Sequence, residues 1–198
     1  MASDPQTDRS DQAAYALEAI RHLVWAGFYE PDEIVEIVTE DRLESDDVDA
    51  DWVAERVDEA RREKAAAERG WPETTDCDRL DAAFDALERS GILALHNAGY
   101  TQSDGITDVT EAWHELGAEA SAVEGYCFYH GQDVERAVDG HGLMLTFGHI
   151  LGDDARGVRV GERIVRMLVE HGLRPSWPGT IGERIDLPDL DWRRRGPR

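Results

Sequence analysis

The first seventy residues place apolar side chains at the three- and four-residue steps that are typical of amphipathic helices. A first helix is expected to end at Gly27, a second to begin at Pro31, and a third to run from Trp52 to Gly70. The polar start MASDPQTDRS predicts a frayed terminus, and the acidic stretch LESDDVDAD predicts a loop. We therefore expect a helical N-terminal unit, residues 1–74, that packs on the rest of the chain.

Beyond residue 75, short apolar runs alternate with helical patterns. Thr75 and Asp78 have the spacing of a capping box, so a helix is expected from there to Gly91. Asp108 is expected to cap a second helix. The expected strands lie at 92–95, 126–130, 143–147 and around 184–187, with helices at 132–139 and about 153–171 in the last two gaps.

The resulting order, β-α-β-(α)-β-α-β, is that of a ferredoxin-like α+β sandwich with a small helix inserted between the second and third strands. In that arrangement the first two strands are parallel and the third lies between them. A parallel α/β sheet is the alternative, but the connection from His130 to Leu143 is close to the minimum length of a crossover, about a dozen residues. We expect the α+β arrangement, in a core domain of residues 75–198.

Composition narrows the possible partners. The chain has 198 residues, 41% of them hydrophobic, which suits a folded core, and a formal charge of −22 from 43 acidic and 21 basic residues. This charge repels nucleic acids and anionic membranes, so neither is expected as a partner. The acidity indicates either a basic partner or a nucleic-acid mimic, or else a bias for solubility, as in salt-adapted proteins. The basic tail DWRRRGPR can dock on the acidic body, contact a partner or stay solvated.

Cysteine usage and hydropathy indicate a cytoplasmic protein. Cys77 and Cys127 are far apart and form no CxxC pair, which favours reduced thiols over a disulfide or a zinc site. No apolar run approaches the ~18 residues of a membrane span, and no signal peptide is recognisable at the start. Phosphate-binding, dinucleotide-binding and GxSxG motifs are absent, so no cofactor is expected.

A polar cluster is expected where the first two core strands end. If these strands are parallel, their carboxyl ends lie at the same edge of the sheet, and the following loop reaches the same region. Imidazoles and carboxylates there can bind a divalent metal or act as a general acid–base pair. The candidate residues are His96, Asn97, Asp104, Asp108, His130, Gln132 and Asp133.

Each member of this cluster also has a structural explanation. His96 can be a buried histidine bonded to the backbone, and Asn97 can belong to the turn. Gln132 and Asp133 can begin a short helix, where an acidic residue is favoured. No two of the residues have a metal-site spacing such as HxH, so no metal is assigned.

A second candidate surface lies near the C-terminus. Trp177 and Trp192 flank a segment that contains Arg184, and tryptophan and arginine are enriched at interfaces. Packing inside the protein is the other explanation for the two aromatic residues.

Three segments of the core resemble a family of bacterial domains of unknown function. They are ILALHNAGYTQSDG, GYCFYHGQDVERAVDGHGLMLTFG and WPGTIGERIDLPDLDWRRR. The likeness spans about residues 75–195, with a looser match in the N-terminal helices. The family has no assigned activity, so the resemblance implies one architectural unit and supplies no catalytic residue.

The sequence therefore favours a non-enzymatic binding or regulatory module with an acidic surface, acting on an unidentified protein or small molecule. It does not define an oligomeric state. The alternative is a small metal-dependent or acid–base hydrolase-like enzyme. That enzyme would use His96, His130 and Asp133 with Asp104 or Asp108.

Overall fold

The chain folds into two compact units in the computed structural model, which describes residues 5–41 and 49–197. A helical unit comprises residues 1–73 together with 193–198, and an α+β unit comprises residues 74–192. The basic C-terminal residues thus group with the helical unit, although the sequence placed them in the core domain. The packing of the helical unit on the core stays a prediction.

The helical unit begins earlier than its apolar pattern indicates. Its elements are α1 (Pro5–Ala26), α2 (Pro31–Glu36), the π-helical turn η1 (Ile37–Asp41) and α3 (Ala50–Glu68). The first helix includes residues that were expected to be frayed, because a proline at its first position suits a helix start and few strong helix breakers follow. Residues 1–4 and most of the expected acidic loop, residues 42–48, lie outside the described part of the chain.

The three helices of this unit bury one apolar stripe each. Ile20, Ile34 and Val53 come from α1, α2 and α3 respectively, and all three are in the same buried cluster. The only lysine of the sequence, Lys64, is also buried, and its Nζ donates a hydrogen bond of 3.0 Å to the carbonyl of Val24 in the last turn of α1. A cation is favoured there because helix C-termini carry partial negative charge.

The basic tail docks by its arginine side chains on the helical unit. The guanidinium of Arg194 lies 4.6 Å from the ring centre of Phe28, and that of Arg195 lies 6.0 Å from the ring of Trp71. Arg195 also donates a hydrogen bond of 2.8 Å to the carbonyl of Pro72. Cation–π contacts of this kind contribute to holding an arginine side chain against an aromatic ring. Among the alternatives for the tail, docking within the chain is the one observed.

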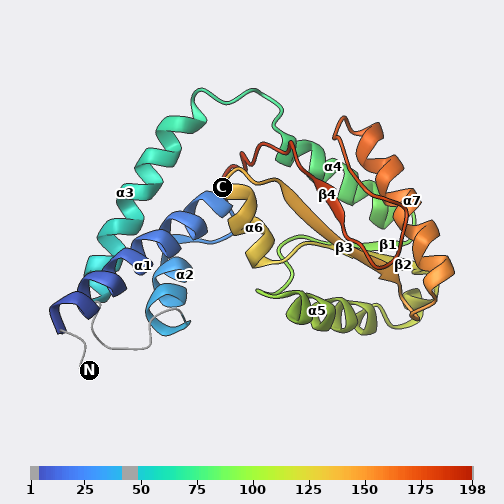
Figure 1. The fold of residues 1–198 in the computed structure, drawn as a ribbon, viewed down its shortest axis with the longest axis horizontal. Coiled ribbons are helices and arrows are strands. Elements are labelled where there is room, and N and C mark those ends of the chain that lie inside the picture. Colours follow the sequence, from blue (N-terminus) through green and yellow to red (C-terminus); the bar gives the residue numbers. More distant parts are fainter. Residues whose placement is uncertain (1–4, 42–48, 198) are drawn as a thin grey trace. The chain divides into compact units, whose positions relative to one another are not determined.

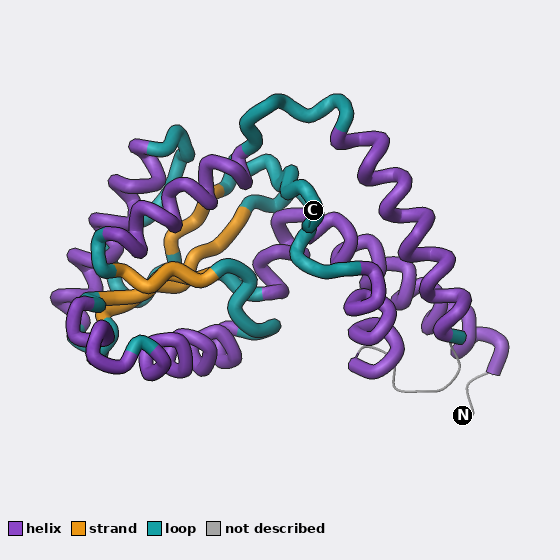
Figure 2. The backbone as a smooth tube through the Cα atoms, turned by 180° about the vertical axis from the view of Figure 1, so that it is seen from behind, coloured by secondary structure: helices purple, strands orange, loops and turns teal. Residues whose placement is uncertain are grey.

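The α+β unit is a four-stranded mixed sheet with helices on both faces (Figures 1 and 2). Figure 1 shows α4 and α7 on one face of the sheet and α5 on the other. The strands are β1 (Ile92–Leu95), β2 (Gly125–Phe128), β3 (Leu143–His149) and β4 (Ile185–Leu187). The helices are α4 (Asp76–Arg89), α5 (Gln102–Glu115), the 3₁₀ turn η2 (Gly117–Ala122), α6 (Gly131–Val138) and α7 (Asp154–Glu170).

The α+β class is confirmed, but the strand order is not the ferredoxin-like one. The sheet has the order β1-β2-β3-β4, in which β1 and β2 are parallel direct neighbours, and the β2–β3 and β3–β4 pairs are antiparallel. The third strand therefore does not lie between the first two. The all-parallel alternative is also wrong, because the chain between β2 and β3 folds into the short helix α6 and returns antiparallel.

The register of the sheet decides which side chains share a face. Tyr126 lies opposite Gly148, and Phe128 lies opposite Thr146. Side chains alternate between faces along a strand, so Tyr126, Phe128 and Thr146 share one face. Phe128 packs against Val109 of α5, which identifies this face as the α5 side. Cys127, between them in sequence, belongs to the opposite face.

Helix α5 starts six residues before Asp108, the residue expected to cap it. Thr101 is the actual N-cap and forms a capping box with Asp104, while Asp108 lies in the second turn. The sequence pattern does not show the first turn of this helix, because it contains Gly105 and glycine favours turns. The glycine is needed for packing: a Cβ at this position would lie 2.3 Å from the Phe128 ring.

No helix in the described ranges, 5–41 and 49–197, is both long enough and apolar enough to cross a membrane.

Candidate functional site

Asp133 is the centre of a buried charge network in the α+β unit. It occupies the first turn of α6 and is 3% exposed. Arg184, just before β4, donates from Nη1 to Oδ1 at 3.0 Å and from Nη2 to Oδ2, and Nη2 also donates to the carbonyl of Met144 at 3.0 Å. A bidentate pair of this kind fixes both side chains. It also ties α6 to β3 and to the start of β4.

His130 completes this network. It is the N-cap of α6, and its backbone N–H donates to Oδ2 of Asp133 at 3.2 Å. Its ring Nε2 lies 3.1 Å from the same oxygen, so the neutral tautomer with the proton on Nε2 fits the contact. Its Nδ1 makes no hydrogen bond with the described residues. Together His130, Asp133 and Arg184 form what we call the α6 network.

Burial lowers the pKa of His130, and the positive charge of Arg184 lowers it further. The carboxylates of Asp133 and Asp104 and the carbonyl of Tyr100 act in the opposite direction without overcoming burial. His130 is therefore a neutral hydrogen-bond donor near neutral pH, and the carboxylate of Asp133 has Arg184 as its counter-ion.

The free energy of unfolding should fall as the pH drops below 6.5, the ordinary pKa of histidine. The unfolded chain then binds a proton at His130 that the folded chain, with its lowered pKa, does not bind. The contribution of His130 to the free energy of unfolding is complete above pH 6.5, and it decreases as the pH falls toward the pKa of His130 in the folded chain. Urea unfolding at pH 7.5 and 5.5 measures the difference.

His130→Gln should reduce this pH dependence, whereas His141→Gln, at an exposed histidine, should leave it as in the wild type. Equal pH dependence in the wild type and in His130→Gln would contradict the assignment.

His96 lies on the other side of the sheet from the α6 network. Its ring stacks on Phe84 of α4, with centroids 4.5 Å apart, and its Nδ1 lies 2.7 Å from the hydroxyl of Tyr129. Its Nε2 is 3.6 Å from Oδ1 of Asp81, also on α4. The ends of β1 and β2 are neighbours, as expected for parallel strands, but the two imidazoles contact different layers.

The remaining candidates of this cluster have local structural contacts. Asn97 adopts a left-handed conformation with φ of +49° at the turn after β1. Asp104 accepts the N–H of Thr101, and this hydrogen bond lowers the pKa of its carboxyl. Gln132 is exposed in the first turn of α6. No group of three or more His, Cys, Asp or Glu side chains in the described ranges is arranged to hold a metal ion.

The three C-terminal candidates make contacts inside the α+β unit. Trp177 packs edge-on against Phe147, with ring centroids 5.3 Å apart, and Trp192 is 7% exposed and packs edge-on against Tyr129. Arg184 belongs to the α6 network. An interface formed by these residues stays a prediction. Their partial or full burial does not favour it.

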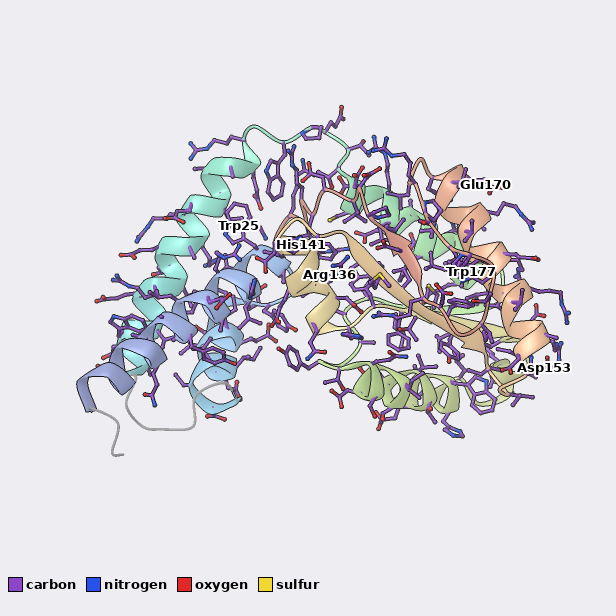
Figure 3. All side chains as sticks on the ribbon, in the orientation of Figure 1. Trp25, Arg136, His141, Asp153, Glu170 and Trp177 are labelled. Carbon is purple, nitrogen blue, oxygen red and sulfur yellow. The ribbon has the colours of Figure 1, made fainter. Side chains whose placement is uncertain are left out.

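A polar pocket of about 260 Å³ lies on the α5 side of the sheet, between β3, the start of α7 and the segment before β4. Arg184 lines it, so the pocket adjoins the α6 network. Figure 3 shows Asp153, another lining residue, at the beginning of α7. The other polar side chains that line it are Gln102, Tyr126, Thr146, His149, Asp154 and Glu183.

Two lining residues carry buried polar atoms that no described residue satisfies. They are the hydroxyl of Thr146, a side chain that is 5% exposed, and the Nε of Arg184. Such atoms are rare in folded proteins and call for an explanation, since each costs about 1–3 kcal/mol when left unpaired. The signal for this site in the sequence is Thr146, which interrupts the apolar run of β3.

Two titratable groups around the pocket have pKa values that are shifted by local hydrogen bonds or by burial. Asp153 caps α7, and the N–H of Arg156 donates to its Oδ1 at 2.8 Å, which lowers the pKa of the carboxyl. Burial raises the pKa of Tyr126. Burial also raises the pKa of the Cys127 thiol, on the opposite face, so it is not a thiolate nucleophile. The described side chains that line the pocket include hydrogen-bond donors and acceptors.

The fold and the pocket define the chain as an α+β domain with a mixed four-stranded sheet and a polar pocket at one end of it. The chain belongs to the family described as a domain of unknown function, DUF6891, whose model matches residues 9–196. The match includes the N-terminal helices as well as the core, so the family domain spans both units. No curated protein and no solved structure matches the chain.

Proposed function

We propose that this protein is a non-enzymatic binding or regulatory module that takes a small polar ligand in the pocket beside the α6 network. The observation that carries the proposal is a pair of unsatisfied buried atoms, Thr146 Oγ1 and Arg184 Nε, that belong to two residues lining one cavity. A pocket in which a few polar groups converge is the usual form of a small-molecule site.

A bound ligand can supply the hydrogen-bond partners that the fold does not provide for Thr146 Oγ1 and Arg184 Nε. Hydrogen bonds to Thr146 and Arg184 would remove the cost of two unpaired buried groups and so contribute to the affinity. The α6 network holds Arg184 by its two Nη atoms, which fixes the direction of the remaining Nε–H. The site is thus organised before a ligand arrives, which lowers the entropy cost of binding.

The enzyme alternative has less support. It needs His96, His130 and Asp133 to act together with Asp104 or Asp108. In the fold, His96 contacts α4, Asp133 is engaged by Arg184, and Asp108 lies inside α5. Burial also lowers the pKa of His130, which weakens it as a base at neutral pH.

A thermal-shift screen of the full chain against small polar compounds tests the proposal. A ligand at 100 times its Kd should add about 2.7 kcal/mol, and so several degrees in Tm. Thr146→Val should abolish most of this response, because valine has the same shape without the hydroxyl.

The same substitution should raise the stability of the free protein by about 1 kcal/mol, since it removes an unpaired buried group. Thr110→Val is the matched control on α5: its hydroxyl bonds to the carbonyl of Ile106 at 2.9 Å outside the pocket, and the ligand response should be retained. The proposal is overturned if no compound stabilises the wild type, or if Thr146→Val binds as the wild type does.

A further inference from the structure

We infer that the ligand of this pocket is an amine of amino-acid size, whose carbonyl oxygen binds Arg184 and Thr146 and whose ammonium group faces the acidic side of the pocket. The inference rests on the proposed binding function and adds the chemical class of the ligand. It follows from the hydrogen-bond donors, the charges and the size of the cavity.

The inner wall of the pocket requires an acceptor. Arg184 donates hydrogen bonds from Nη1 to Asp133 and from Nη2 to Asp133 and the carbonyl of Met144. Its Nε–H is the donor that has no acceptor among the described residues. A guanidinium has no acceptor and stays protonated, so its ligand atom must be an acceptor. The hydroxyl of Thr146 can donate to the same atom. A carbonyl oxygen, with two lone pairs, can accept from both.

The charges around the cavity disfavour an anion. The positive charge of Arg184 is already matched by the buried carboxylate of Asp133. Three carboxylates, from Asp153, Asp154 and Glu183, also line the pocket. His149 lines it as well, and its Nδ1 accepts the N–H of Asp153 at 3.3 Å, so this atom is not a donor to a ligand.

Arg156 and Arg159 of α7 are near enough to influence Asp153, but neither lines the cavity. A phosphate or a dicarboxylate would therefore meet repulsion, whereas an ammonium group would be attracted.

The size and the apolar wall limit the rest of the ligand. About 260 Å³ is just below the range of drug-sized sites, roughly 300–1,000 Å³, so the ligand is small. Ile106 and Ile181 provide apolar surface in the same cavity. A short aliphatic side chain on the amine would bury against them.

Four probes separate these features: L-leucinamide has the amine, the carbonyl and the side chain; N-acetyl-leucinamide lacks the charge; isopentylamine lacks the carbonyl; and inorganic phosphate is an anion. Calorimetry with the full chain should give the highest affinity for L-leucinamide. N-acetyl-leucinamide and isopentylamine should each bind at least tenfold more weakly, and phosphate should not bind.

Two variants test the acidic side. Glu183→Gln should weaken L-leucinamide at least threefold and leave N-acetyl-leucinamide unchanged, because only the first carries a charge. Glu162→Gln, at an exposed position on α7 outside the pocket, should change neither affinity. Thr146→Val should weaken both carbonyl-containing probes and leave isopentylamine unchanged.

The outcomes distinguish the two proposals. Tighter binding of phosphate or of N-acetyl-leucinamide than of L-leucinamide, still dependent on Thr146, overturns the amine inference and leaves the binding function in place. A lack of binding by all four probes, while other compounds in the screen bind through Thr146, has the same meaning. A lack of any Thr146-dependent ligand overturns both.

Discussion

Replacing Asp133 by asparagine is expected to lower the free energy of unfolding of the α+β unit by about 3–5 kcal/mol, the usual effect of removing one partner of a buried ion pair. The variant leaves the guanidinium of Arg184 partly buried without a counter-ion and takes an acceptor from His130. Urea denaturation followed by far-UV circular dichroism measures the change. A loss below about 1 kcal/mol would contradict the central role given to the α6 network.

A second arginine–aspartate pair in the same unit provides the control. Arg174 Nε lies 3.4 Å from Oδ2 of Asp189, but the two side chains are 79% and 61% exposed. Asp189→Asn should therefore cost less than about 1 kcal/mol. The double variant Asp133→Leu with Arg184→Met should recover part of the loss, because neither charge is then buried alone.

Phe84→Ala should be about as destabilising, by about 3–5 kcal/mol, through the cavity that it leaves between α4 and the sheet. Phe84 is 1% exposed, and its ring centre lies 4.5 Å from that of His96 and 5.7 Å from that of Tyr129. Removing the ring takes away the surface on which His96 stacks. Urea denaturation again measures the effect.

Leu151→Ala is the matched control for apolar truncation, since Leu151 is 72% exposed. Its stability should stay within about 0.5 kcal/mol of the wild type. If both variants lost the same amount, the core position of Phe84 would be wrong.

Local signals predicted the helices well where a cap and an apolar stripe coincide. The capping box of Thr75 and Asp78 is present, with hydrogen bonds in both directions, and the helix that follows ends at Arg89. The same type of box at Thr101 and Asp104 was missed, because Gly105 follows it immediately. A glycine is needed at position 105 because the Phe128 ring lies close to its backbone, and no local sequence pattern contains this long-range contact.

The candidate site was predicted in part for the same reason. His130 and Asp133 do lie together, since their spacing of three residues at a helix start brings them close. Asp133 and Arg184 were named separately and are 51 residues apart, so nothing in the local sequence joined them. Thr146 and Tyr126 are not predicted as site residues, because an isolated polar residue in a strand indicates no particular partner.

The sequence by itself determined the elements and the α+β class of this protein, because helix and strand periodicity depends on near neighbours in the chain. Tertiary structure alone decided the order β1-β2-β3-β4, since the first three strands are similarly apolar and their local patterns fit several orders. It also decided that His96 and His130 contact different layers. Finally, it brought Arg184 to Asp133 and placed Arg184 and Thr146, two residues with an unsatisfied buried polar atom each, at one pocket.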